Sequence, residues 1–309
     1  MNSLLVVGSL AYDTVETSNG KFDNLLGGSA TYFSAAASFF SPVHVVGVIG
    51  DDFKEEDLEF FKKRNVDFSG VEKESGETFR WSGRYSLDFS SRETLFTHLN
   101  VFEHFDPKIP ESLRKTPFVF LANIGPQLQL NVLNQIDQPK FVALDTMNYW
   151  IDRSIDSLED VISRVDGLII NDEEAKQLTG KTNLVTAMLS LQQMGPKVII
   201  VKKGEHGVMM RMNDEFFFLP AFPVDKIEDP TGAGDTFAGG YMGYLAYSDH
   251  LSELAHRNAV VFGSALASYC VEGIGPKKLK SISKDDVYHR YRTFQKLTHF
   301  EFTEKNVEH

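Results

Sequence analysis

The stretch "EDPTGAGDTFAGGYMGYL", residues 228–245, places two glycines and an aspartate at the start of an apolar, helix-like run. Thr231 is an acceptable N-cap, so we expect a helix to begin here and to continue through its glycines. The first N–H groups of a helix lack intrahelical partners, and the helix dipole makes that end positive. Gly232, Ala233 and Gly234 would leave these N–H groups open to an anion such as phosphate.

Asp235 stands beside this positive helix end. A carboxylate held ionised there can accept the proton of a hydroxyl that attacks a phosphoryl group. A structural alternative stays open, because an aspartate in the first turn often only offsets the dipole and glycines there often serve close packing. The spacing is not a dinucleotide-binding fingerprint, and no Walker A sequence occurs in the chain.

The composition suits one large α/β domain: the chain has 309 residues, of which 42% are hydrophobic. A net charge of -12 argues against nucleic acid or an anionic membrane as the main partner. The single cysteine, Cys270, cannot form an intrachain disulfide, which favours a cytoplasmic location. The start "MNSLLVVGSLAYDT" resembles a first strand more than a signal peptide, and no apolar run approaches membrane-spanning length.

Short apolar runs alternate with helical patterns along the chain. We expect strands at 4–10, 43–50, 118–123, 140–145, 167–171 and 197–204, and helices at 29–40, 55–64, 172–180 and 185–195. This alternation predicts a mostly parallel sheet with helices on both faces. Ligands of such sheets gather at the carboxyl ends of the strands, where the sequence has Asn123, Asp145, Asn171 and Gly204.

One segment, 78–101, instead has a period of two, with Phe79, Trp81, Tyr85 and Leu87 on one face. The two halves around "DFSS" predict an antiparallel hairpin outside the main sheet. A sheet this small needs a cover for its apolar face, and the main domain, a ligand or a second subunit could supply it.

The stretch "DPTGAGDTFAGGYMGYL" closely resembles the C-terminal signature of the ribokinase-like (PfkB) carbohydrate kinases. The resemblance extends over nearly the whole chain, through a Gly-Gly helix start, a hairpin insertion, N-x-x-E and a G-x-x-G turn. It implies one ribokinase-like domain over 1–309, a three-layer α/β sandwich with a mostly parallel central sheet. It also implies a small β-sheet lid formed by about 12–25 and 78–101.

The resemblance implies roles for residues in the C-terminal half. Asp235 matches the catalytic base, and Gly232, Ala233 and Gly234 match the anion hole. Asp229 and Thr231 match positions that lie near a monovalent cation, potassium, in some members. On the nucleotide side the matching residues are Asn171, Lys203, Gly204, Gly207 and Asn258, with Glu174 in the magnesium shell through water.

The residues themselves leave structural alternatives open for these nucleotide-side positions. Asn171 and Glu174 have the spacing of a helix capping box. The segment 202–207 is also typical of a hairpin turn, and Asn258 of a polar residue on an amphipathic helix.

Four residues of the N-terminal half match substrate-binding positions of the family. Asp13 matches the acidic residue that binds sugar hydroxyls, and Gly27 and Gly28 match the glycine pair of the first signature. A turn and a helix entry are the structural alternatives. Tyr32 departs from the pattern, because many sugar kinases have asparagine there and a phenol cannot replace the paired donor and acceptor of an amide.

Lys202 and Lys203 are a second departure, since they replace a common Thr-Leu pair; they could hold phosphate or face solvent. Trp81 and Phe96 could touch the substrate, but lid core or a homodimer interface through the lid accounts for such aromatic residues as well.

The expected function is an ATP- and magnesium-dependent kinase that phosphorylates a hydroxyl of a small sugar or sugar derivative. A nucleoside is the second substrate class, because Tyr32, Phe33 and the aromatic lid could stack on a base. A noncatalytic binding protein of the same fold is a further alternative, and a Rossmann dehydrogenase is the weakest.

Overall fold

The computed structural model of the protein describes residues 2–89 and 91–301. Its main sheet contains β1 Leu4–Val7, β4 Val43–Ile49, β5 Val66–Lys73, β8 Phe118–Leu121, β9 Phe141–Leu144, β10 Gly167–Asn171, β11 Val198–Lys202, β12 Val208–Met212 and β13 Glu215–Leu219. Within the described residues the strand order is β13-β12-β11-β10-β9-β8-β1-β4-β5. Pairing is parallel from β11 to β5 and antiparallel at β12 and β13, so the predicted mostly parallel sheet is confirmed.

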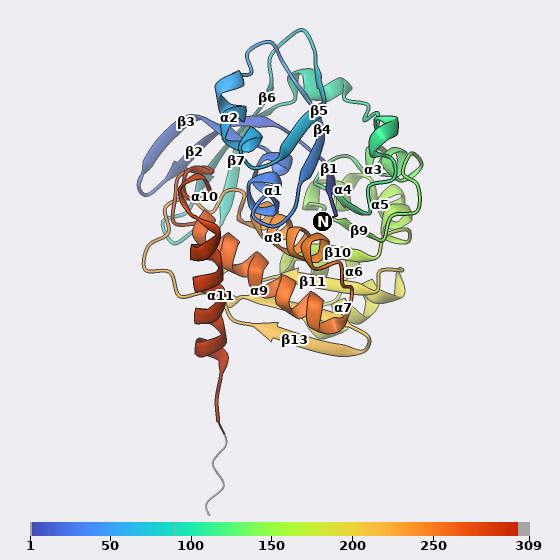
Figure 1. Ribbon diagram of the computed structural model, residues 1–309, viewed down its shortest axis with the longest axis vertical. Helices are drawn as coiled ribbons and strands as arrows, with labels where there is room; N and C mark the ends of the chain where they lie inside the picture. Colours follow the sequence, from blue (N-terminus) through green and yellow to red (C-terminus); the bar gives the residue numbers. More distant parts are fainter. Residues whose placement is uncertain (1, 90, 302–309) are drawn as a thin grey trace, which may run out of the picture.

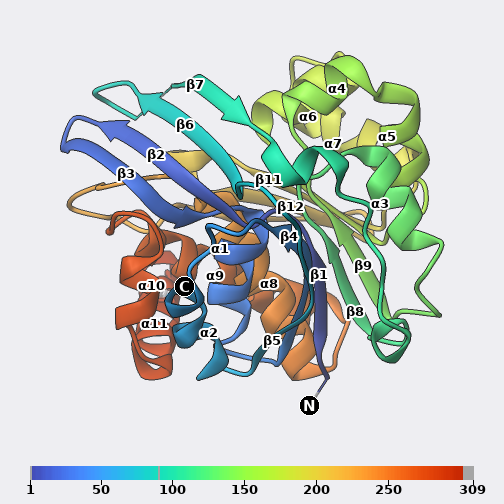
Figure 2. The same ribbon diagram turned by 90° about the horizontal axis from the view of Figure 1, so that it is seen from above.

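Helices cover both faces of this sheet (Figures 1 and 2). One face carries α1 Ser29–Ala37, α2 Glu59–Lys62, α8 Ala233–Ser248, α9 Glu253–Cys270, α10 Lys277–Ser281 and α11 Lys284–Thr298. The other carries α3 Pro126–Leu133, α4 Asn148–Arg153, α5 Ile155–Ile162, α6 Asp172–Thr179 and α7 Leu184–Gln193. Short 3-10 turns lie at Glu55–Leu58, Asn100–His104, Glu111–Leu113 and Gly204–His206. The expected three-layer sandwich is therefore present.

The two faces of the sheet hold separate apolar cores. In β1, Leu4 and Val6 pack into one cluster while Leu5 and Val7 pack into the other, and all four are fully buried. A strand buried on both sides must be apolar at every position, which explains the uninterrupted runs in the sequence. None of the helices in the described part of the chain has the length and apolar character needed to cross a membrane.

The lid segments form one small sheet in the order β3-β2-β6-β7. Its strands are β2 Ala11–Thr17, β3 Gly20–Gly27, β6 Phe79–Tyr85 and β7 Arg92–His98. β6 and β7 pair antiparallel, which confirms the predicted hairpin, and β2 joins the two segments by pairing in parallel with β6. The figures show this sheet apart from the main sheet, with β3 near α10 (Figures 1 and 2).

The start of α8 differs from the sequence-based expectation by one residue. The N-cap is Gly232 and not Thr231. Gly232 has φ +74°, a left-handed conformation that glycine adopts without the steric cost that a side chain brings. The expected helices at 29–40 and 55–64 are also shorter, since the first ends at Ala37 and the second begins as a 3-10 turn.

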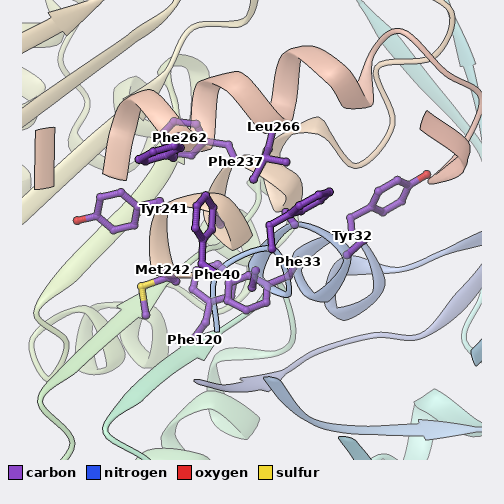
Figure 3. Packing of buried hydrophobic residues seen from close by; sticks show 14 of the residues in the cluster. Tyr32, Phe33, Phe40, Phe120, Phe237, Tyr241, Met242, Phe262 and Leu266 are labelled. Carbon is purple, nitrogen blue, oxygen red and sulfur yellow. The ribbon is translucent and has the colours of Figure 1, made fainter. Parts of the chain in front are cut away.

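Glycines inside α8 let three helices approach closely. A methyl group on Gly239 would lie 2.2 Å from the carbonyl oxygen of Phe33 in α1, and one on Gly240 would lie 2.9 Å from the Cα of Gly263 in α9. Aromatic side chains fill the remaining space, and Phe33 stacks on Phe120 of β8 at 4.5 Å (Figure 3). This close packing fixes α8 against its neighbours.

We predict that Gly239→Ala destabilises the protein, although alanine favours a helix over glycine by about 1 kcal/mol. The added methyl group would force α8 away from α1, which should lower the free energy of unfolding by about 1–3 kcal/mol in a denaturant titration. Gly125→Ala is the matched control, because Gly125 has φ -56° and its methyl group would meet Trp150 at 3.6 Å, an ordinary contact. Equal stability of the two variants would contradict the packing explanation.

Candidate active site

The first turn of α8 lies directly beside the ammonium group of Lys202. A methyl group on Gly234 would lie 3.0 Å from Lys202 Nζ. Lys202 is the last residue of β11, so its side chain leaves the carboxyl end of that strand toward the helix start. One of the expected anion-hole donors is engaged elsewhere, since the Ala233 N–H donates to the carbonyl oxygen of Pro230 at 3.2 Å.

Carboxylates from the end of β9 and from the first turns of α6 and α8 surround Lys202. Its Nζ lies 3.2 Å from Asp145 Oδ2, and Asp145 follows β9 directly. Burial opposes the lysine charge, but Asp145, Glu174 and Asp235 raise the pKa of Lys202 above its ordinary value. Because Asp145 is only 6% exposed, burial raises its pKa, while Lys202 and the Thr146 N–H oppose that shift. The result is a charged cluster at one edge of the sheet.

Asp235 in the first turn of α8 is half-buried within this cluster. Burial and repulsion from Asp145 raise the pKa of Asp235 to about 7, against the opposing effects of Lys202 and Arg92. A carboxylate with a pKa near 7 is suited to accept and release protons at neutral pH. Asp235 therefore lies in the first turn of α8 with a proton affinity that suits acid–base chemistry near neutral pH.

Asn171 and Glu174 form the capping box that their spacing allows. Asn171 Oδ1 accepts the Glu174 N–H, and Glu174 Oε2 accepts the Asn171 N–H, each at 2.8 Å. Burial, followed by repulsion from Asp145, raises the pKa of Glu174 to about 7. Glu174 thus caps α6 and also belongs to the charged cluster, so the structural alternative and the functional one are compatible.

The glycine pair and Asp13 meet at the junction of the lid and α1. A methyl group on Gly27 would lie 2.0 Å from Asp13 Oδ2, so only glycine permits this approach. Burial, with repulsion from Asp229 and Asp235, raises the pKa of Asp13 to about 8, and the Gly28 N–H opposes the shift by a hydrogen bond. Asp13 is thus a buried carboxyl group that interacts electrostatically with Asp235.

Tyr32 lies under the α8 turn. The ring is 2% exposed, and a methyl group on Gly232 would lie 2.3 Å from it. Tyr32 therefore supports the glycine turn from the side of α1 (Figure 3). Such burial leaves little of the ring available to a substrate, and this is where the chain departs from the family pattern.

Asp229 and Thr231 brace the segment that leads into the turn. Asp229 Oδ1 accepts the Thr231 N–H at 2.9 Å, and its Oδ2 accepts the Gly275 N–H at 3.0 Å. The Thr231 hydroxyl lies 3.0 Å from the hydroxyl of Tyr85 in β6, so the lid contacts this segment. Both side chains thus have structural partners at the positions matched to a monovalent cation site.

The remaining nucleotide-side residues lie on more open parts of the structure. The Lys203 N–H donates to the Gly207 carbonyl oxygen at 2.8 Å, which closes the turn between β11 and β12. Gly204 is exposed in this turn. Asn258 Oδ1 accepts a hydrogen bond from the Tyr291 hydroxyl at 2.9 Å, which links α9 to α11. The structure thus gives Asn258 a structural partner.

Two residues of the site were not assigned from the sequence, and a third was left undecided. Asp145 was noted only as a strand end, although its place after a buried strand was a usable signal. Of the two adjacent lysines, the resemblance matches Lys203 to the nucleotide side, whereas the structure places Lys202 beside Gly234 and Asp145, because successive side chains of a strand alternate. Arg92 had no sequence signal, yet its charge lowers the pKa of both Asp13 and Asp235 from the lid.

Comparison with known proteins gives this geometry a context. The family model described as pfkB family carbohydrate kinase matches residues 1–281. A cytidine kinase of Thermococcus kodakarensis is 31% identical over 249 residues, which cover 78% of this chain and 88% of that protein. An inositol 3-kinase of Arabidopsis thaliana is 23% identical, with 93% of this chain and 80% of the relative covered.

Solved structures share the fold at lower identity. The nucleoside kinase of Methanocaldococcus jannaschii superposes with a TM-score of 0.76 at 21% identity, covering 95% of this chain and 99% of the other. An E. coli protein assigned as ribokinase II, solved with ATP and Mg²⁺, gives a TM-score of 0.77 at 17% identity, with 95% and 100% covered. With the family model spanning most of its length and the ribokinase fold in place, this chain belongs to the pfkB family of carbohydrate kinases.

Proposed function

We propose that the protein is an ATP-dependent kinase that phosphorylates a hydroxyl group of a small polyhydroxylated acceptor, a sugar or a nucleoside. The observation that carries this proposal is that Asp235 and the ammonium group of Lys202 both lie at the start of α8. The carboxyl group has a pKa of about 7, and the ammonium group lies against Gly234. A base and a cation at a helix N-terminus are the groups that phosphoryl transfer to an alcohol requires.

In this mechanism each residue of the chain has one task. Asp13 orients the acceptor through its hydroxyls, and Asp235 accepts the proton of the hydroxyl that attacks the terminal phosphorus of ATP. Lys202 and the open N–H groups of the α8 turn offset the charge on the transferring phosphoryl group. The lid sheet excludes water, which would otherwise compete as acceptor.

The sequence favours a sugar as the acceptor, with a nucleoside as the second class, and relatives of both kinds support keeping the two. The cytidine kinase relative supports a nucleoside, while the inositol 3-kinase relative keeps a cyclic polyol open. A noncatalytic binding protein is disfavoured, because a base and a cation at the helix start would then have no use.

The donor set fits magnesium that is held mainly by ATP. Within residues 2–89 and 91–301, no group of three His, Cys, Asp or Glu side chains converges as a metal site. Mg²⁺ usually keeps several waters and binds phosphates with one or two carboxylates, so Glu174 would act through water. When bound, the ion would neutralise phosphate charge. Potassium at Asp229 and Thr231, adenine contacts by Asn258, a cytoplasmic location and a homodimer through the lid remain predictions.

Asp235→Asn should fold and bind ATP but lose phosphoryl transfer by a factor of about 10² or more, the scale of general-base catalysis. The measurement is single-turnover transfer with purified protein, beside ATP binding by calorimetry. Near-normal turnover in a folded variant would overturn the assignment of Asp235 as the base.

Lys202→Met should change the pH profile as well as the rate. Because Asp235 must be ionised to act, kcat/KM should rise with pH through about 7 in the wild type. Lys202 lowers the pKa of Asp235, so its removal should move this limb to higher pH and reduce the maximal rate by about 10². Lys203→Met is the matched comparison and should leave the limb in place. If both variants moved the limb equally, the adjacent position of Lys202 would not explain the effect.

Glu174→Gln should separate capping from a magnesium-linked role. Glutamine also serves in a capping box, so the melting temperature should stay close to that of the wild type. The magnesium concentration needed for half-maximal activity should rise, since a neutral amide attracts the hydrated ion less. A magnesium titration identical to the wild type would leave Glu174 as a cap alone.

A further inference from the structure

The inner face of the lid sheet is identified by Tyr85, whose hydroxyl reaches Thr231 beside the α8 turn. Side chains alternate along a strand, so Trp81 and Gly83 lie on the same face of β6 as Tyr85. Asp13 of β2 pairs with Trp81 in the parallel register and shares that face. The inner face therefore places an indole beside the carboxyl group proposed to orient the acceptor.

The Trp81 indole lies across Gly83. A methyl group on Gly83 would lie 2.2 Å from the six-membered ring, so the ring could not occupy this position over any other residue. The indole N–H donates to the Thr94 hydroxyl of β7 at 3.4 Å, and the Arg92 guanidinium carbon lies over the ring, 5.4 Å from its centre. The ring is thus supported by the sheet, and the Arg92 guanidinium lies over it.

Trp81 is not used as core. It is half-buried and belongs to neither of the two apolar clusters. Phe96 offers a useful contrast, because it pairs with Ser82 on the opposite, outer face, where it packs on His98 at 4.7 Å. Of the two aromatic residues singled out in the sequence, only Trp81 therefore faces the active site.

We propose that the Trp81 indole is a stacking surface for a planar heteroaromatic ring, and that the acceptor is consequently a nucleoside. Neighbouring strands are about 4.8 Å apart, so an acceptor with its hydroxyls at Asp13 would carry a directly attached ring to Trp81. A base that stacks on the indole would displace the Arg92 guanidinium from the ring, and Arg92 and Thr94 would then supply donors that suit the exocyclic oxygens of the base. A sugar or polyol can lie against an indole only through its C–H groups and offers no conjugated ring to stack on it. This inference rests on the proposed kinase function and names its substrate class.

Binding can be tested by fluorescence without catalysis. The chain has two tryptophans, Trp81 and Trp150, so Trp150→Phe leaves Trp81 as the single indole. The four common ribonucleosides, ribose and myo-inositol are titrated against this variant. We expect at least one nucleoside to quench the Trp81 emission saturably, while ribose and myo-inositol leave it unchanged. If no nucleoside changes the emission, or if ribose changes it equally, the inference is wrong.

Kinetics provide the second arm, with ATP consumption measured for the same acceptors. Trp81→Leu should raise the KM for the nucleoside about 10-fold or more, the effect of removing one stacked ring, with little change in the KM for ATP. Trp81→Phe should retain most of the affinity, and Gly83→Ala should resemble Trp81→Leu because it displaces the indole. Phe96→Leu on the outer face is the matched control and should leave the nucleoside KM unchanged.

The outcomes separate the two proposals. Asp235-dependent phosphorylation of ribose or inositol that is insensitive to Trp81→Leu would overturn the nucleoside inference and leave the kinase function standing. Saturable nucleoside quenching without ATP consumption by any acceptor would support the stacking site and overturn the kinase function. A Trp81→Leu variant that loses ATP and nucleoside affinity equally would show that the indole only holds the lid together.

Discussion

The charged contact between Lys202 and the start of α8 is the constraint on which the site depends. The ammonium group is held by Asp145 at 3.2 Å and lies beside Gly234, so a cation faces the end of a helix that is itself positive. Removing one partner of a buried ion pair is costly, about 3–5 kcal/mol, because the other charge is left uncompensated. The surrounding carboxylates therefore keep Lys202 charged. Lys202 and the helix end together create a positive potential, which Asp145, Glu174 and Asp235 partly offset. The part that is not offset can attract an entering anion.

Packing explains how this potential is held in place. Gly239 and Gly240 bring α8 against α1 and α9, and Tyr32 supports Gly232 from below. A helix held by backbone contact has little freedom to shift, so its first turn keeps one position relative to β11. The glycines that weaken α8 as an isolated helix are the same ones that fix its start. These glycines lower the helix propensity of α8 but fix the position of its first turn, and such local conflicts are common at functional sites.

The lid shares contacts with both halves of the site. β2 carries Asp13, which touches the glycine pair before α1, and Tyr85 of β6 reaches Thr231 before α8. Arg92 of β7 brings a positive charge that lowers the pKa of Asp13 and Asp235. Movement of this sheet would therefore change the proton affinity of the proposed base as well as the access of water. Under the proposed function, these side chains would link the position of the lid sheet to the proton affinity of Asp235.

The sequence by itself determined the alternation of strands and helices, the two-sided burial of the main sheet, the hairpin at 78–101 and the position of Asp235 at a helix start. These are local properties: apolar runs, a period of two and a glycine-rich helix start are each readable within a few residues. Only the tertiary structure decided that Lys202, and not Lys203, faces the helix, and that Asp145 and Arg92 join the site. It also placed Tyr32 beneath a turn 200 residues away. Such contacts depend on the spacing and direction of distant elements, which no short stretch of sequence specifies.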